Sequence, residues 1–153
     1  VVRGQYPHLA EHIAQKKAIY MRYKEGFRDL PVTMNPYDEA ASEPNFWLSC
    51  LLIDREAMCP QVRGEKEALY ISQPGKTCPS EILETLAKYN AEGRPIWKPM
   101  HMQPIFRMNG FVTGGVEDVG MDIFQRGLCL PSDNKMTEAE QDAVIEIVRS
   151  CFA

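Results

Sequence analysis

One stretch constrains the fold more than any other: Arg94-Pro95-Ile96-Trp97-Lys98-Pro99-Met100-His101-Met102-Gln103-Pro104. Its prolines exclude a helix, because each one removes a backbone donor and clashes with the preceding turn. The segment is therefore expected to run extended, with fixed bends. Its bulky polar and aromatic side chains on a stiff backbone form either a presented site or an edge strand that leads into a proline-rich loop.

Helices are predicted on both sides of this segment. Pro7 suits the first turn of a helix, where its missing donor costs nothing, and glycines mark helix ends. Thr137-Glu138-Ala139-Glu140 is a capping box, in which the side chains of Thr137 and Glu140 satisfy unpaired backbone donors. The predicted helices cover residues 7–26, 79–92, 118–126 and 137–152, with stops at Gly26, Gly93 and Gly127. Their predicted buried faces carry Leu9, Ile13 and Tyr20, then Ile82, Leu83, Leu86 and Tyr89, and finally Ala143, Val144, Ile147, Val148 and Cys151.

Strands are predicted between these helices. Residues 46–53 are apolar on both faces, which indicates a central and largely covered strand. Residues 128–130 form a short strand that ends at Pro131. Residues 54–76 are polar and predict a long loop, in which residues 69–71 offer one further short strand. Helices and strands thus alternate along the chain, which predicts an α+β fold with a small sheet packed by helices.

Length and charge narrow the class of protein. The chain has 153 residues, which is the size of one domain. Its net charge is −4 and it has no run of lysine or arginine, so no dedicated surface for nucleic acid or an anionic membrane is expected, although a local basic spot for a phosphate stays open. Its longest apolar runs fall far short of the roughly 20 residues that span a bilayer. It begins at Val1 without an initiator methionine, so we expect an internal fragment of a longer protein.

The five cysteines are widely scattered, and none forms a C-x-x-C pair. We therefore expect free thiols in a reduced, cytoplasmic protein. Cys50, Cys129 and Cys151 fall in predicted strands or on an apolar helix face, which favours buried structural thiols over nucleophiles. Cys59 and Cys78 lie in or beside the long loop and are expected to be exposed.

His8-Leu9-Ala10-Glu11-His12 matches the H-x-x-E-H pattern of some zinc proteases. Such a site needs a third ligand, and the one remaining histidine, His101, lies about ninety positions further on. We therefore favour a solvated helix face for this segment, expect no metal site, and keep a metalloprotease as a distant alternative.

Trp97 and His101 stand four positions apart in the extended segment, where both side chains could point the same way. A flat indole can stack on a sugar or a base, and an imidazole beside it can donate or accept a hydrogen bond. Core packing of Trp97 with a surface His101 is the competing interpretation. Lys98 offers a Schiff-base amine if it is desolvated, a cation for a phosphate, or a plain surface charge.

Two long motifs carry a resemblance to a known family. Segment 94–104, followed by Asp122-Ile123-Phe124-Gln125-Arg126-Gly127-Leu128-Cys129-Leu130-Pro131-Ser132, resembles the C-terminal part of sugar-nucleotide aminotransferases of the DegT/DnrJ/StrS type. Residues 3–24 resemble the family's linking helix, residues 45–48 one of its strands, and residues 137–152 its C-terminal helix. The resemblance implies the small domain of a fold type I aminotransferase, with a mostly antiparallel sheet. A linking helix would cover residues 1–28 and the small domain residues 29–153.

The resemblance also implies a function. Members of the family transfer an amino group, usually from glutamate, to a keto group on a nucleotide-linked sugar, in pathways of bacterial surface polysaccharides and glycans. Their N-terminal domain holds pyridoxal phosphate on a lysine, and their active sites form at a homodimer interface. The lysines of this chain do not match the sequence context of the cofactor lysine. The resemblance therefore implies no catalytic and no cofactor-binding residue here, and no activity for this piece alone.

By position, the resemblance places segment 94–104 over the sugar nucleotide. Trp97 would form a wall for the sugar, His101 would bond a hydroxyl, and Arg94 or Lys98 would meet the diphosphate. Two rivals stay open: a free-standing module that binds a nucleotide sugar without chemistry, and a structural interaction domain. An exposed apolar patch is expected where the family's larger domain packs.

Overall fold

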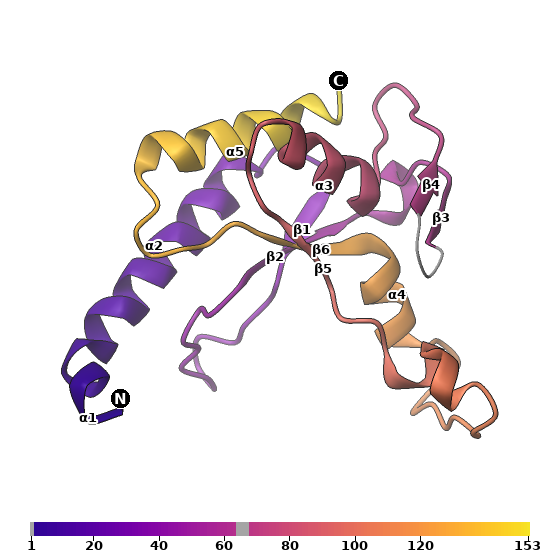
Figure 1. The fold of residues 1–153 in the computed structure, drawn as a ribbon, viewed down its shortest axis with the longest axis horizontal. Helices are drawn as coiled ribbons and strands as arrows, with labels where there is room; N and C mark the ends of the chain where they lie inside the picture. The colour runs from indigo at the N-terminus through magenta and orange to yellow at the C-terminus, as the bar shows by residue number, and fades with distance from the viewer. Residues whose placement is uncertain (1, 64–67) are drawn as a thin grey trace.

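The computed structural model describes residues 2–63 and 68–153, which form a small sheet with helices packed against it (Figure 1). The sheet has the strand order β1-β2-β6-β5, and each neighbouring pair is antiparallel. Its strands are β1 (Val32–Met34), β2 (Ser49–Ile53), β5 (Arg94–Pro95) and β6 (Gly127–Leu130). The predicted α+β fold with a mostly antiparallel sheet is therefore confirmed.

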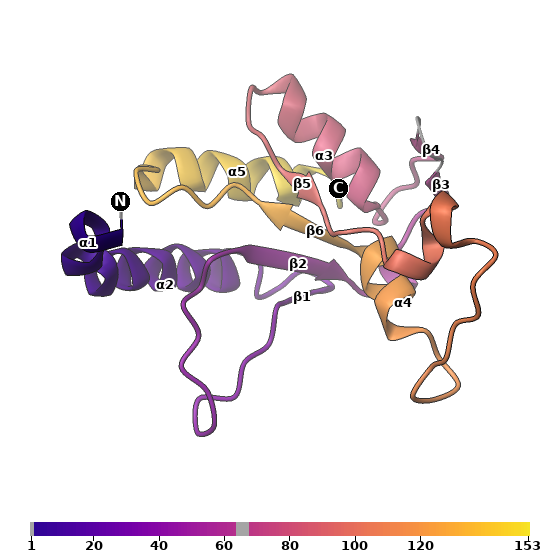
Figure 2. The ribbon, with the colours of Figure 1, turned by 60° about the horizontal axis from the view of Figure 1, so that its bottom comes forward.

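Helices surround this sheet unevenly, and Figure 2 shows α3 and α5 on one side of it. The helices are α1 (Val2–Gln5), α2 (Leu9–Gly26), α3 (Pro79–Lys88), α4 (Val119–Arg126) and α5 (Glu138–Ser150). Single 3-10 turns cover Tyr6–His8, Arg55–Ala57, Met100–Met102 and Pro104–Phe106. A separate hairpin, β3 (Gln61–Arg63) with β4 (Ala68–Tyr70), lies within the predicted 54–76 loop. In the described part of the chain, no helix combines the length and the apolarity needed to cross a bilayer.

Strand β2 shows how the two faces of the sheet differ. Its residues alternate between buried and half-buried, and Leu51 is among the buried ones. Leu51 pairs with Leu128 on β6, and cross-strand partners share a face, so both leucines join the helix-packed core. That core also contains Tyr23, Phe27, Ile82, Leu86, Val144 and Val148. The half-buried Cys50 belongs to the opposite face.

Tyr23 anchors α2 in this core. Its side chain is fully buried, and its hydroxyl donates a hydrogen bond to the carbonyl of Pro131 at 2.7 Å. Its ring stacks nearly parallel on Phe27, with centroids 5.7 Å apart. Burial raises the pKa of the Tyr23 hydroxyl far above its ordinary value, so this group stays a donor at any physiological pH.

Helices α2 and α5 are also joined by ion pairs across long sequence separations. Arg22 on α2 binds Asp142 on α5 at 2.7 Å. Arg149 on α5 binds Asp29, just beyond α2, at 2.6 Å, and donates to the carbonyl of Gly26 at 2.9 Å. The first long helix and the last helix thus pack as one unit.

The sheet differs from the prediction at three places. Strand β2 begins at Ser49 rather than at residue 46, because Phe46 has a φ of 52°, in the left-handed region that a strand excludes. In segment 94–104 only the first two residues pair as β5, since 3-10 turns follow the prolines. Strand β1 was not predicted at all, because three residues are too short to show a period.

Helix α3 ends at Lys88 rather than at residue 92. Asn90 adopts a φ of 58°, which reverses the chain three residues before the predicted stop at Gly93. Tyr89 follows the last helical residue, so its side chain leaves the apolar face and is 70% exposed instead of buried.

The buried faces of α2 and α5 are rotated from those predicted. Along α2 the buried residues are Ile19, Tyr20 and Tyr23, and Leu9 is exposed because no element covers the start of the helix. Along α5 Ala143 is exposed, whereas Gln141, Val144, Ile145 and Val148 are buried. The predicted capping box at Thr137 is confirmed, as is the start of α4, whose N-cap is Asp118.

Candidate functional site

A groove of about 880 Å³ lies on the face of the sheet opposite the core helices. The strand register places it there: Arg94 pairs with Cys129, and Cys129 pairs with Cys50, so these three residues share a face. The groove is lined by side chains of three kinds, cationic, aromatic and acidic. They include Lys16, Arg63, Arg94, Lys98, Trp47, Trp97, Glu92 and Asp133.

Two tryptophans form an open aromatic wall in this groove. Trp47 and Trp97 are 64% and 65% exposed, and their ring centroids are 6.1 Å apart at an angle of 38°. Core packing of Trp97 is therefore wrong. The preceding Ile96 is half-buried, lies against Gly127 and also lines the groove. Two large exposed indoles side by side offer a flat apolar surface for a ligand ring.

The cationic side chains of the groove differ in whether they already have a partner within the protein. Arg94 forms an ion pair with Glu92 at 2.5 Å, and the ammonium of Lys16 donates to the carbonyl of Ser132. Lys98 is half-buried and forms no ion pair with any residue in the described ranges 2–63 and 68–153. Lys98 therefore keeps its donors for a ligand anion.

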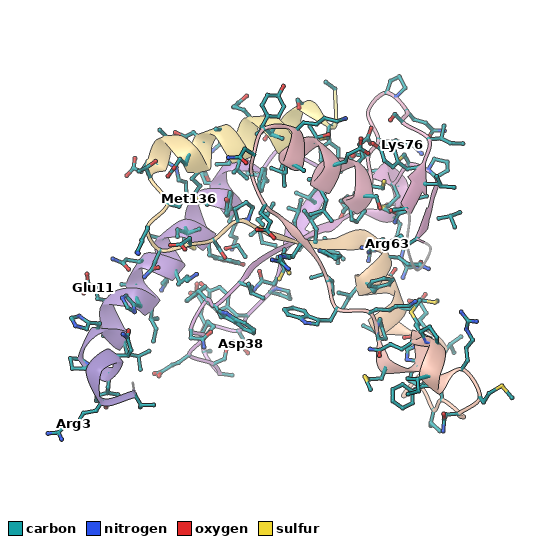
Figure 3. The ribbon with its side chains drawn as sticks, in the orientation of Figure 1. Arg3, Glu11, Asp38, Arg63, Lys76 and Met136 are labelled. Atoms are coloured by element: carbon teal, nitrogen blue, oxygen red, sulfur yellow. The ribbon has the colours of Figure 1, made fainter. Side chains whose placement is uncertain are left out.

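Arg63 reaches the groove from the β3–β4 hairpin, and Figure 3 labels it beside α4. Its guanidinium lies 4.3 Å above the ring of Phe124 and donates to the carbonyl of that residue. Burial lowers the pKa of Arg63 from its ordinary value. Sequence reasoning missed Arg63, Lys16 and Trp47 as groove residues, because each comes from an element far from segment 94–104.

Cys129, which lines the groove, forms a pair of thiols with Cys50 on the neighbouring strand. The sulfurs of Cys50 and Cys129 are 3.7 Å apart, with both cysteines free. The hydrogen bond between the two thiols raises the pKa of Cys50, and burial raises it further. A high pKa makes a poor nucleophile, which agrees with the structural role predicted for this cysteine. Cys59 and Cys78 contradict their prediction, because both are buried rather than exposed.

The structure does not bring His101 into the groove. Its Nε2 lies 2.6 Å from Oδ2 of Asp118, and its ring stacks on Phe111 with centroids 3.6 Å apart. Oδ1 of Asp118 in turn accepts the backbone N–H of Met121 at 2.9 Å and caps α4. His101 therefore ties the second half of segment 94–104 to the start of α4.

The H-x-x-E-H segment is a solvated helix face, as predicted. His8 and His12 have ring centroids 6.2 Å apart, and Nδ1 of His8 lies 3.8 Å from the carboxylate of Glu11. The side chains of His8 and Glu11 are both more than half exposed. Among the residues that the structure describes, neither histidine belongs to a group of three metal-ligating side chains.

A second hollow, of about 660 Å³, lies beside α4 and is rich in charge. Two of its three arginines are paired with carboxylates: Arg126 donates to Asp122 at 2.9 Å, and Arg55 donates to Glu117 at 3.0 Å, whereas the third, Arg63, is shared with the groove. Arg126 also donates to the carbonyl of Ile53 at 2.5 Å, so this network holds α4 on strand β2. The groove, by contrast, combines two exposed indoles with Lys98, which has no carboxylate partner within the described residues, and this favours the groove as the candidate site.

The carboxyl of Asp122 is expected to make the protein sensitive to acid. Hydrogen bonds from Arg126 lower its pKa, and the charge of Arg55 lowers it further. A carboxyl with a depressed folded pKa stabilises the fold above its unfolded pKa of about 3.9, and this stabilisation is lost as the pH falls through the folded value. Urea unfolding is measured from about pH 6 to about pH 2, the range in which carboxyls titrate. Over this range, the free energy of unfolding is expected to fall less for Asp122→Asn than for the wild-type protein. An equal fall in both proteins would contradict this role.

Comparison with known proteins identifies the family. Residues 1–149 match the model of the DegT/DnrJ/EryC1/StrS aminotransferase family. The chain is 34% identical over 147 residues to EpsN of Bacillus subtilis (strain 168), which carries the name of a pyridoxal phosphate-dependent aminotransferase. That alignment covers 94% of this chain and 32% of EpsN. The chain thus spans about a third of the length of this relative.

Solved structures show the same fold. A DegT DnrJ EryC1 StrS aminotransferase from Brucella abortus superposes with a TM-score of 0.72 over 100% of this chain and 34% of its own, at 18% identity. Helicobacter pylori PseC, an aminotransferase involved in the biosynthesis of pseudoaminic acid, superposes with a TM-score of 0.70 over 97% of this chain and 35% of its own, at 15% identity. With the match of the family model over nearly its full length, this chain belongs to the DegT/DnrJ/EryC1/StrS aminotransferase family.

Proposed function

We propose that this chain is the C-terminal part of an aminotransferase that acts on a nucleotide-linked keto-sugar, with glutamate as the amino donor. The observation that carries the proposal is the groove, in which the Trp47–Trp97 wall stands beside the cations Arg94 and Lys98. A sugar linked to a diphosphate presents an apolar ring face and negative charge together. The family membership and the relatives named above support the reaction class.

Each side chain has a part in this proposal. Trp97 forms a wall against the sugar or the base, and Arg94 and Lys98 meet the diphosphate. His101, held by Asp118, acts as a positioning residue that fixes segment 94–104 rather than as a direct ligand. In the proposed division, residues 1–28 form a linking helix and residues 29–153 the small domain. We further propose that the complete protein is a homodimer located in the cytoplasm.

Pyridoxal phosphate, the family's cofactor, supplies the electron sink of the reaction when it is bound. It needs a lysine for covalent attachment in an enclosed pocket. In the groove, Lys16 and Lys98 lie in an open depression with exposed tryptophans. These residues do not fit the cofactor, so we place its site outside this chain and assign this chain the binding and orientation of the sugar nucleotide. Residues 1–153 alone are then expected to be inactive.

The test is Trp97→Ala in the complete gene product, assayed with nucleoside-diphosphate-linked keto-sugars. Loss of one stacking contact is expected to raise the KM for the sugar nucleotide about 10-fold or more, since such contacts stabilise binding by roughly 1–3 kcal/mol. The KM for the amino donor is expected to stay the same, because the donor has no nucleotide to stack. Tyr89→Ala is the matched control, since Tyr89 is similarly exposed but lies outside the groove. An unchanged KM in Trp97→Ala would refute the assignment.

A second function, a nucleotide-sugar-binding module without chemistry, is favoured by one observation: the wall and the cations of the groove all come from this chain. The two functions differ in the complete gene product. Binding of the sugar nucleotide without transfer of an amino group would favour the module, whereas formation of an amino-sugar favours the enzyme.

A further inference from the structure

A second group of reactive side chains lies away from the groove, where the 54–76 segment meets α3. The ligand atoms of Cys59, Cys78 and Glu81 all lie within 4.8 Å of one another. Cys59 and Cys78 are 2% and 0% exposed, and the sulfur of Cys59 lies 3.9 Å from Oε2 of Glu81. The proposed function uses none of these three residues.

The backbone holds the two cysteines opposite each other. The N–H of Cys59 donates to the carbonyl of Thr77 at 2.9 Å, and the N–H of Thr77 donates to the carbonyl of Ala57 at 3.0 Å. These bonds form a parallel bridge between two extended segments. Cys78 then serves as the N-cap of α3, and Glu81 follows in the first turn, so their side chains meet on one side of the helix start.

The carboxylate of Glu81 is itself fixed by neighbours. The hydroxyl of Thr77 donates to its Oε2 at 2.8 Å, and the hydroxyl of Ser72 donates to its Oε1 at 2.5 Å. Hydrogen bonds of this kind orient the first ligands of metal sites. Thr77 is fully buried, which makes its hydroxyl a permanent part of the arrangement.

The spacing suits a tetrahedral zinc ion. Zinc bonds of roughly 2.3 Å to sulfur and 2.0 Å to oxygen place neighbouring ligand atoms about 3.5–3.8 Å apart. The observed 3.9 Å between the sulfur of Cys59 and Oε2 of Glu81 is within about 0.4 Å of the sulfur–oxygen value of about 3.5 Å. A hollow of about 370 Å³, lined by Ser72, Glu81 and Cys151 among others, opens beside Glu81 and gives a path for the ion and for a water ligand.

The charge of the group also favours a cation. Within residues 2–63 and 68–153, Glu81 forms no ion pair with a lysine or arginine. Two buried thiols that served only as small apolar groups would need no carboxylate next to them, and a disulfide would need none either. A divalent cation uses all three donors at once.

We propose that Cys59, Cys78 and Glu81 bind one thiophilic divalent cation of the zinc class, with a water molecule as the fourth ligand. Binding releases the two thiol protons to solvent and leaves two thiolates and one carboxylate on the metal. The cation ties the segment after β2, the segment before α3 and the first turn of α3 together. This replaces the expectation from sequence that the chain has no metal site, and it is independent of the proposed function.

The experiment uses the complete gene product, purified without a histidine tag and titrated with zinc against a chelator of known affinity. One zinc ion per chain is expected. Cys78→Ser is expected to abolish this ion, whereas Cys129→Ser, which removes a buried thiol outside the group, is expected to retain it. In the cobalt-loaded protein, a thiolate-to-cobalt charge-transfer band is expected and is lost in Cys78→Ser.

Thr77→Val replaces the buried hydroxyl with a methyl group of similar size. This second variant keeps the proposal testable if Cys78→Ser fails to fold. It is expected to weaken zinc affinity roughly 10-fold, as changes to supporting hydrogen bonds do at metal sites. No zinc uptake by the folded wild-type protein would overturn the proposal. So would zinc that survives in folded Cys78→Ser, equal affinity in Thr77→Val, or a Cys59–Cys78 disulfide in the freshly purified protein.

Discussion

Replacing Gly127 with alanine is expected to lower the free energy of unfolding by about 3 kcal/mol, the upper part of the usual range for overpacking. Gly127 begins β6 directly after α4. A Cβ atom there would lie 2.6 Å from the carbonyl oxygen of Ile123 and 2.8 Å from Cγ1 of Ile96. The first contact is with backbone, which cannot rotate away. Urea unfolding followed by circular dichroism measures the loss.

The same substitution is expected to disturb the groove. Ile96 precedes Trp97, so a shift of Ile96 moves the indole relative to Trp47 and changes the tryptophan fluorescence of the folded protein. Gly110→Ala is the control, because nothing lies within 4 Å of a Cβ atom at that position. Equal stabilities of Gly127→Ala and Gly110→Ala would show that α4 and β6 are less closely joined than described.

Replacing Tyr23 with alanine is expected to cost about 4 kcal/mol, as for other large aromatic side chains deleted from a core. The ring is fully buried and stacks on Phe27, so its loss leaves a cavity between α2 and the sheet. The deletion also leaves the carbonyl of Pro131 without the hydroxyl that donates to it.

Tyr23→Phe separates these two contributions. It keeps the ring and removes only the hydroxyl, and is expected to cost about 1 kcal/mol, the usual net value of one hydrogen bond. Thermal unfolding of the two variants and the wild type provides the comparison. If Tyr23→Phe were as unstable as Tyr23→Ala, the hydroxyl rather than the ring would be the main anchor of α2.

The sequence predicted those elements whose signals are local. The capping box at Thr137 needs only four residues, and residues 128–130 show strand character because aliphatic residues end at a proline. Strand β2 was placed too early because Phe46 and Trp47 look like strand residues. Only the turn at Phe46, which carries a positive φ, shows that the strand has not yet begun.

The candidate site was predicted in part for the same reason. Arg94, Trp97 and Lys98 share one stiff segment, so their common location follows from the chain itself. Trp47, Lys16 and Arg63 join them only through the strand register and the hairpin, which no local pattern reveals. His101 was grouped with Trp97 by spacing, but the 3-10 turn at Met100–Met102 rotates it towards Asp118.

The buried cysteines were misjudged because polarity was taken as a guide to exposure. Residues 54–76 are polar along most of their length, yet a bridge between Met58 and Thr77 carries Cys59 under the start of α3. The two bridged residues are 19 positions apart in the sequence, from 58 to 77. The partner of each residue is therefore invisible to any window of neighbouring residues.

The packing of α2 against α5 has a consequence for synthesis on the ribosome. Arg22 and Asp142, and likewise Asp29 and Arg149, are 120 residues apart in the chain. Ribosomes add roughly 5–20 residues per second, so about 6–24 s pass between the synthesis of α2 and the synthesis of α5. Throughout that interval the apolar side of α2 that carries Tyr23 has no α5 to pack on. Nascent chains of this protein therefore expose the apolar side of α2 before α5 is made. Chaperones that bind exposed apolar helices are expected to bind α2 during this interval.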